Sequence, residues 1–239
     1  MPEDPRGQAL HALSQFLVSG QSMGDTLHRV AEITTGALPA ATMAGISILD
    51  DRGRPKTAIF TDESSPEIDA GQYESGRGPC LDAWREKRTV RIDDMDMASS
   101  DYPEFSKAAQ EHGIQSTLSL PLVANDNGLG ALNLYAKPTK GFSAADEEMG
   151  VDLAAAAAIV LANATAYWDA RNLGEQLNEA MKSRAEIEQA KGILMAQSPG
   201  INADDAFDLL RRASQRENVK LRDVAKRIVE RRSLSADTA

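Results

Sequence analysis

The spacing of the apolar residues divides the first 140 residues into helices and strands. Between residues 8 and 40 the apolar positions mostly recur every three or four residues, which predicts helices. Ser22 to Asp25 carries the residue types of a helix N-cap and predicts a break between two helices. From Ile46 onward the period becomes two, which predicts strands.

The expected strands alternate with turns and short helices. The strands are expected at 46–48, 57–61, 89–92, 118–122 and 129–135. The turn-like sequences DDRG at 50–53 and NDNG at 125–128 predict hairpins. Two short helical segments, 79–87 and 103–112, separate strands.

After Gly141 the chain consists of helix formers up to Gln197, which predicts one long helix. Ser143 followed by Asp146 resembles a capping box and is expected to begin it. Its second half carries a heptad stripe of residues at alternating four- and three-residue steps: Leu173, Leu177, Ala180, Arg184, Ile187, Lys191 and Leu194. The stripe favours a two-chain coiled coil. For residues 145–170, packing against the first domain of the same chain remains equally open.

The last segment predicts three helices, of which the end of the long helix is the first. Ser198-Pro199-Gly200 ends that helix, and Asn202 is expected to cap the next. The apolar faces of the second and third helices are expected to consist of Ala206, Leu209, Leu210 and Ala213, and of Leu221, Val224, Ala225 and Ile228. A bundle of roughly 45 residues has little core, so it is expected to depend on a neighbour or a partner for stability.

The charge is distributed unevenly. The chain of 239 residues has a formal net charge of −10, so its mean field repels phosphate. Residues 1–180 hold 14 Lys and Arg against 27 Asp and Glu, whereas residues 209–232 hold nine against three. One end of an acidic protein is therefore basic.

Several function classes have no support in the sequence. The single cysteine, Cys80, cannot form an intramolecular disulfide, and His11, His28 and His112 share no metal-ligand spacing. A redox or bilin role for Cys80 competes with a small buried apolar residue, and the second interpretation is favoured. With no secretory signal, no uncharged apolar run of about 18 residues and no catalytic arrangement, we expect a cytoplasmic protein that is not an enzyme and needs no cofactor.

The C-terminal motifs resemble a known family. They are AKGILM at 190–195, AFDLLR at 206–211 and NVKLRDVA at 218–225. Over residues 184–229 this pattern resembles an ANTAR domain, the three-helix RNA-binding module of bacterial antiterminators. The resemblance implies RNA as the partner and regulation of transcription as the activity.

The basic residues of this segment are compatible with RNA binding. On helices, Arg184 and Lys191 flank the apolar face of the first helix, and Arg212 and Arg216 lie one turn apart. The expected RNA-binding residues are Arg184, Lys191, Arg211, Arg212, Arg216, Asn218, Lys220 and Arg222. The competing interpretation is that these cations form only a solvated face.

Three upstream segments, GPCLD at 78–82, TVRIDDM at 89–95 and SLPL at 119–122 followed by GALNL at 130–134, resemble a GAF domain. This resemblance covers about residues 10–165 and implies a six-stranded antiparallel sheet with helices on one face and a pocket on the other.

These observations predict an α+β protein with four parts. A GAF-like domain at 1–142 and a coiled-coil-like helix at 143–183 precede an ANTAR bundle at 184–232 and a disordered tail at 233–239. The expected function is signal-responsive antitermination, in which a homodimer binds paired hairpin loops of leader RNA. The alternative is a small-molecule sensor whose C-terminal bundle binds a protein. No metal and no membrane partner are expected, and the GAF ligand is not predicted.

Overall fold

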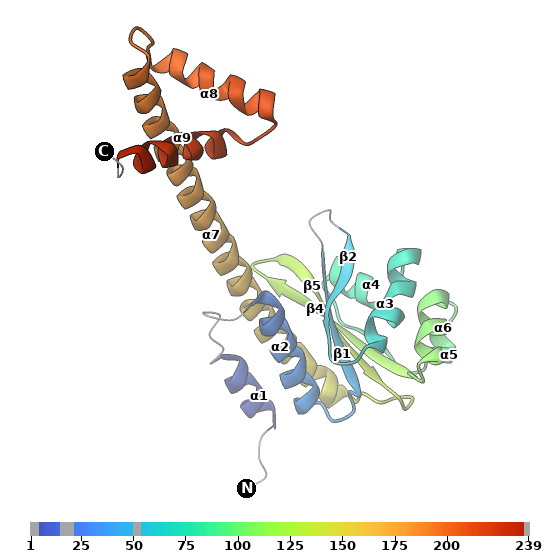
Figure 1. Ribbon diagram of the computed structural model, residues 1–239. Helices are drawn as coiled ribbons and strands as arrows, with labels where there is room; N and C mark the ends of the chain where they lie inside the picture. The colour runs from blue at the N-terminus through green and yellow to red at the C-terminus, as the bar shows by residue number, and fades with distance from the viewer. Residues whose placement is uncertain (1–4, 15–21, 50–53, 237–239) are drawn as a thin grey trace. The chain divides into compact units, whose positions relative to one another are not determined.

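The computed structural model describes residues 5–14, 22–49 and 54–236 (Figure 1). The chain divides into two compact units, unit 1 at residues 1–168 and unit 2 at residues 169–239. Helix α7, Ala144–Gln197, contributes to both units. Each unit is described below by itself.

Unit 1 is built on an antiparallel sheet in the order β2-β1-β5-β4-β3. The strands are β1 Met43–Leu49, β2 Pro55–Phe60, β3 Val90–Ile92, β4 Ser116–Ala124 and β5 Asn127–Ala136. All five predicted strands are confirmed. The GAF resemblance implied six strands, and this expectation is corrected to five within the described residues.

The hairpin between β4 and β5 is the tight turn that its sequence predicts. Ala124 pairs with Asn127, which leaves Asn125 and Asp126 as a two-residue loop. Both have positive φ, 51° and 63°, as the favoured two-residue hairpin turns require. The predicted turn at 50–53 lies outside the described residues.

Six helices precede α7 in the described part of unit 1. They are α1 Pro5–Ser14, α2 Met23–Ala37, α3 Ser64–Ser75, α4 Pro79–Glu86, α5 Met95–Ala98 and α6 Pro103–Glu111. Ser22 and Asp25 form the capping box that begins α2, as predicted. The apolar pattern did not predict α3 or α5. The α3 helix buries mainly polar side chains, so it carries little of the periodicity that indicates a helix.

One face of the sheet is aliphatic and is covered by α1, α2 and the first part of α7 (Figure 1). Ile46, Leu118, Leu120 and Leu132 lie on this face, each fully buried. The α7 residues in the same core are Leu153, Ala154, Ala157, Ala158, Val160 and Leu161. This part of α7 therefore packs against its own domain, which is one of the two arrangements left open by the sequence.

The same part of α7 is long and apolar enough, by composition, to cross a membrane. Of its apolar side chains, Leu153, Val160 and Leu161 are buried against the sheet, whereas Val151 and Ile159 are exposed. Such partial burial is weak evidence for a membrane span, because the core helix of a soluble domain can have the same composition.

Unit 2 contains the C-terminal part of α7, α8 Ala203–Glu217 and α9 Leu221–Ala236. The predicted boundaries are confirmed, because Ser143 and Asp146 form the hydrogen bonds of a capping box at the start of α7. Gly200, with a φ of 100°, follows its end. Asn202 and Asp205 form a capping box that begins α8. The α9 helix continues to Ala236, so the first four residues of the expected tail are helical, and residues 237–239 lie outside the described part.

The core of unit 2 is small. Its buried residues, among those described, are Ala190, Ala206, Leu210, Val224 and Ala225, with partly buried apolar residues around them. Leu209 was expected in this core but is 44% exposed. Since Ala206, Leu210 and Ala213 face inward at four- and three-residue steps, Leu209 lies on the flank of α8.

We expect the aliphatic face to dominate the stability of unit 1. Leu120→Ala removes a fully buried side chain and should lower the free energy of unfolding by about 2–5 kcal/mol. The matched control is Val151→Ala on α7, since Val151 is 45% exposed and its change should stay within about 0.5 kcal/mol. Urea unfolding followed by circular dichroism measures both. Equal midpoints for the two variants would contradict the assignment of this core.

Candidate nucleic-acid interface

Three of the predicted RNA-binding cations are exposed and available. Arg184 comes from α7, Arg212 from α8 and Lys220 from the corner before α9. Among the described residues, no carboxylate pairs with any of the three. A cation without a carboxylate partner keeps its full charge for a phosphate.

The remaining predicted cations are paired with carboxylates. Lys191 contacts Glu188 at 2.9 Å, and its side chain is only 15% exposed. Arg211 contacts Asp208 at 2.8 Å, and Arg216 contacts Glu217 at 3.4 Å. An RNA phosphate would have to compete with these carboxylates.

Arg222 links two elements of the bundle. Its guanidinium contacts Glu179 of α7 and lies 3.8 Å from Asp223. Arg227, which the sequence did not single out, contacts Glu217 of α8. This contact lowers the pKa of the Glu217 carboxyl. Both arginines therefore connect α9 to the rest of unit 2. Their partners, Glu179 and Glu217, are brought near them by the fold, so the sequence alone did not show this role.

Asn218 has a conformational role that the sequence did not assign. It is the C-cap of α8 in the left-handed conformation, with a φ of 53°, and its N–H donates to the Ser214 carbonyl. Asparagine tolerates this conformation better than most residues. Its side chain is exposed, so it remains available to a ligand.

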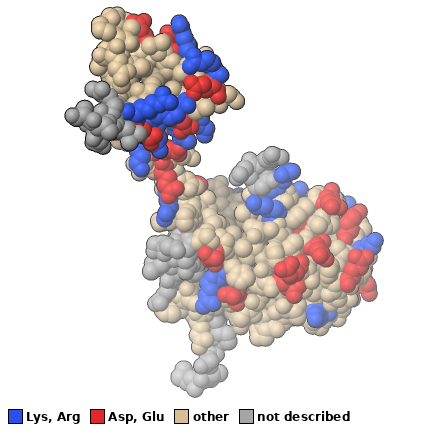
Figure 2. Space-filling model, in the orientation of Figure 1, with Lys and Arg blue, Asp and Glu red and all other residues tan. Residues whose placement is uncertain are grey.

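Figure 2 shows the cations of unit 2 as several blue patches separated by red carboxylates. The surface thus alternates in sign, and the paired cations carry little net field. Among the predicted RNA-binding residues, the cations without a carboxylate partner in the described part of the chain are Arg184, Arg212 and Lys220, and Lys182 of α7 is a further exposed cation of this kind.

Unit 1 holds a second candidate site, on the sheet face opposite the aliphatic core. Asp69 of α3 is completely buried there. Its carboxylate accepts hydrogen bonds from Thr57 Oγ1, Gln72 Nε2 and Tyr135 OH, each at 2.6 Å. Tyr73 OH lies 3.4 Å away. Burial raises the pKa of the Asp69 carboxyl, and these donors oppose the shift only in part.

The hydrogen bonds continue from Asp69 across the strands. Tyr73 OH lies 2.9 Å from Thr57 Oγ1 and 2.6 Å from Ser47 Oγ, which in turn accepts from Asn133 Nδ2 at 2.9 Å. The Asn133 Oδ1 atom is buried and has no hydrogen-bond partner among the described residues. We call these residues, with Asp69, Gln72 and Tyr135, the Asp69 network. A sheet face of this kind is unusual because buried polar groups are costly unless they are paired.

Cys80 lies beside the Asp69 network. It is buried, its N–H donates to Gln72 Oε1 at 3.0 Å, and burial raises the pKa of its thiol to about 12. The thiol is therefore protonated at neutral pH and unreactive. The interpretation of Cys80 as a small buried residue is confirmed.

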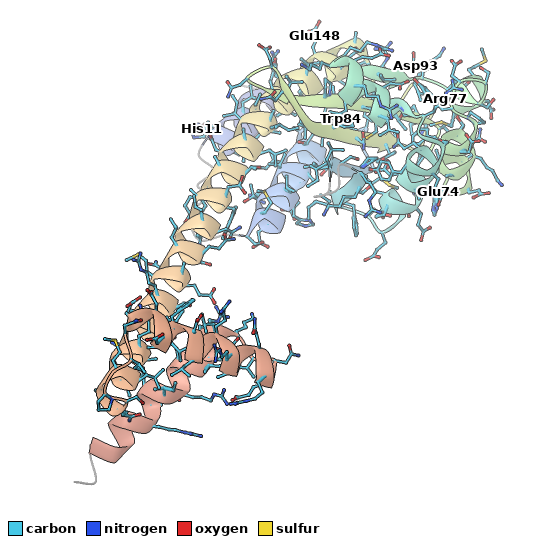
Figure 3. The ribbon with its side chains drawn as sticks, turned by 90° about the horizontal axis from the view of Figure 1, so that it is seen from above. His11, Glu74, Arg77, Trp84, Asp93 and Glu148 are labelled. Carbon is cyan, nitrogen blue, oxygen red and sulfur yellow. The ribbon has the colours of Figure 1, made fainter. Side chains whose placement is uncertain are left out.

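The described residues contain no cluster of His, Cys, Asp and Glu that could hold a metal ion. Figure 3 shows His11 on the opposite side of the view from the carboxylates Glu74 and Asp93, so these three side chains are not brought together.

Trp84, also labelled in Figure 3, holds the hairpin between β4 and β5, because its Nε1 donates a hydrogen bond to the Gly128 carbonyl at 3.1 Å.

Comparison with protein families assigns both units. The GAF domain family matches residues 20–162, and the ANTAR domain family matches residues 175–229. The chain therefore belongs to the GAF family over more than half of its length and carries an ANTAR domain at its C-terminal end. A GAF domain is a sensory domain, and an ANTAR domain indicates an RNA-binding antitermination regulator.

Solved structures share the fold of unit 1. A domain of a protein described as a two-component sensor histidine kinase from Sinorhizobium meliloti 1021 is 15% identical, with a TM-score of 0.53, and the match covers 64% of this chain and 99% of that one. A free methionine-R-sulfoxide reductase from Neisseria meningitidis is 19% identical, with a TM-score of 0.53 and coverage of 68% and 89%. At such identities the likeness shows the fold alone. No curated protein matches the chain significantly.

The buried carboxyl gives unit 1 a specific pH dependence. Burial raises the pKa of Asp69 above its usual value of 3.8, so the folded state holds this proton more tightly than the unfolded state. Its contribution to stability is present below the usual pKa and is lost as the pH rises through the folded pKa. We therefore expect wild-type unfolding free energy to fall, relative to that of Asp69→Asn, as the pH rises from about 4 to 8. Parallel pH profiles in urea unfolding would contradict a raised pKa.

Proposed function

We propose that the protein is a signal-responsive regulator whose unit 2 binds paired hairpin loops in leader transcripts and thereby prevents termination. The observation that carries this proposal is an ANTAR domain in which α7, α8 and the corner before α9 each supply an exposed cation that has no carboxylate partner among the described residues. RNA held in this form cannot build the competing terminator helix.

Binding to RNA requires little bulk charge. The chain as a whole is acidic, so long-range attraction to RNA is weak, and affinity must come from a few local phosphate contacts. Arg184, Arg212 and Lys220 supply these contacts. The paired cations, Arg211 among them, add contacts only where RNA displaces their carboxylate partners. Asn218 adds a contact where RNA approaches its exposed side-chain amide.

We propose further that the regulator acts as a homodimer through α7. Every residue from 169 to 182 is exposed, including Leu173, Leu177 and Met181, which are 57%, 57% and 70% exposed. These three lie four residues apart along one side of the helix. A second copy of the same helix would bury them, and two adjacent bundles would bind two hairpins with a raised effective concentration.

In this proposal unit 1 senses a signal and changes the dimer or the access to the bundle. The protein is cytoplasmic and has no catalytic activity of its own. The regulatory nature of both domain families supports the absence of catalysis, as does the unreactive Cys80 thiol.

The test of RNA binding replaces the three available cations with glutamine in the full chain. The probe is a pool of RNAs with two stems and randomised loops, from which wild type selects its ligands. Each lost phosphate contact on a single strand removes about 0.7 from the slope of log K against log salt, so Arg184→Gln, Arg212→Gln and Lys220→Gln together should reduce the slope by about 2.

The matched control makes the same change of charge on unit 1, at Arg29, Arg88 and Lys107, which are all exposed. Its salt slope should equal that of wild type. If wild type selects no RNA, or if both triple variants bind alike, the RNA function is refuted and the bundle is left as a surface for a protein partner.

The test of dimerisation introduces lysine into the exposed apolar row. Leu177→Lys with Met181→Lys should convert the dimer to a monomer in analytical ultracentrifugation, because two lysines would face their copies across the interface. Asn172→Lys lies on another side of the helix and should leave the dimer intact. A wild type that sediments as a monomer would refute the proposed interface.

A further inference from the structure

Phe207 is the only aromatic residue in unit 2, and it is 39% exposed. The buried residues of this unit are three alanines, a leucine and a valine among the described residues. A bundle with so little core gains most from burying its largest apolar side chain. Phe207 is instead held partly in solvent, on the second turn of α8.

The two flanks of α8 carry different chemistry. With Ala206, Leu210 and Ala213 facing inward, Phe207 and Arg211 lie one turn apart on one flank. Leu209, Arg212 and Arg216 lie on the other flank. One flank therefore pairs an aromatic ring with a guanidinium, and the other pairs an aliphatic side chain with two arginines.

The arginines on the two flanks, Arg211 and Arg212, also differ in whether a carboxylate pairs with them. Arg211 contacts Asp208 at 2.8 Å, so its charge is partly compensated, and its side chain is 55% exposed. Arg212 has no carboxylate partner among the described residues. A guanidinium plane can stack on bases and hydrogen-bond to them, and a cation without a carboxylate partner attracts phosphate most strongly.

We propose that the flank of Phe207 and Arg211 reads unpaired bases of the RNA, and that Phe207 is the surface on which one loop base stacks. This assignment rests on the proposed RNA function and divides its residues into two roles. Phe207 and Arg211 recognise the loop, whereas Arg184, Arg212 and Lys220 contact the backbone. Stacking on an aromatic ring requires an unstacked base, so this flank selects loops over duplex.

The experiment is a double-mutant cycle between Phe207 and the loop. The RNA is the hairpin pair that wild type selects from the randomised pool, prepared with an abasic site at each loop position in turn. Wild type should lose about tenfold in affinity at one position, which corresponds to ~1.4 kcal/mol. Phe207→Leu should bind the intact RNA about tenfold more weakly and lose nothing further at that position.

Three controls separate stacking from folding and from charge. Phe207→Trp keeps a stacking surface and should retain the affinity of wild type. Leu209→Ala removes a side chain of similar exposure from the other flank and should change neither affinity nor the cycle. Phe207→Leu should keep the wild-type salt slope and melting temperature, since it removes no charge and no buried contact of the core.

The outcomes distinguish this assignment from the RNA function itself. If wild type binds the hairpins and Phe207→Leu shows the same abasic losses as wild type at every position, the stacking role is refuted while RNA binding stands. If wild type selects no RNA, the proposed function fails and this assignment fails with it. A Phe207→Leu defect that is equal on loops and on closed duplex would also overturn it.

Discussion

The continuous helix α7 is the constraint on which both units depend. Its first part supplies Leu153, Ala157 and Leu161 to the aliphatic core of unit 1, and its last part supplies Ala190 to the core of unit 2. Neither core is complete without its share of this helix. The bundle of unit 2 is too small to be stable without a well-packed first helix, so the ends of α7, fixed by Ser143 and Gly200, determine where both cores can form.

The two units use polar residues in opposite ways. Unit 1 buries them, because the Asp69 network places a carboxyl and several hydroxyls inside the domain, where each must find a partner. Unit 2 exposes them and pairs most of its cations with carboxylates, so that few remain uncompensated. In unit 1, the loss of one member leaves a buried polar partner without its hydrogen bond, which destabilises the domain. In unit 2, dissolved ions or phosphate groups compete with the exposed ion pairs and weaken them.

Local signals predicted most of the fold. The strands, the capping boxes at Ser22 and Asn202 and the end of α7 follow from residue spacing and cap chemistry, which act within a few residues. Helix α3 was missed because Ser65, Asp69 and Gln72 are among its buried residues, and no apolar period indicates such a helix. The sequence also did not predict which cations pair with a carboxylate. Arg222 is paired with a residue 43 positions away, and only the folded bundle brings the two together.

The exposed stretch of α7 between the two cores has a thermodynamic consequence. Residues 169–182 are all exposed, and an isolated helix of this length is only marginally stable in water. Its backbone amides should therefore exchange with solvent deuterium faster than those of either core, unless a second chain covers them. Fraying of this segment leaves both folded cores intact, so a signal arriving in unit 1 could alter it with a small amount of free energy.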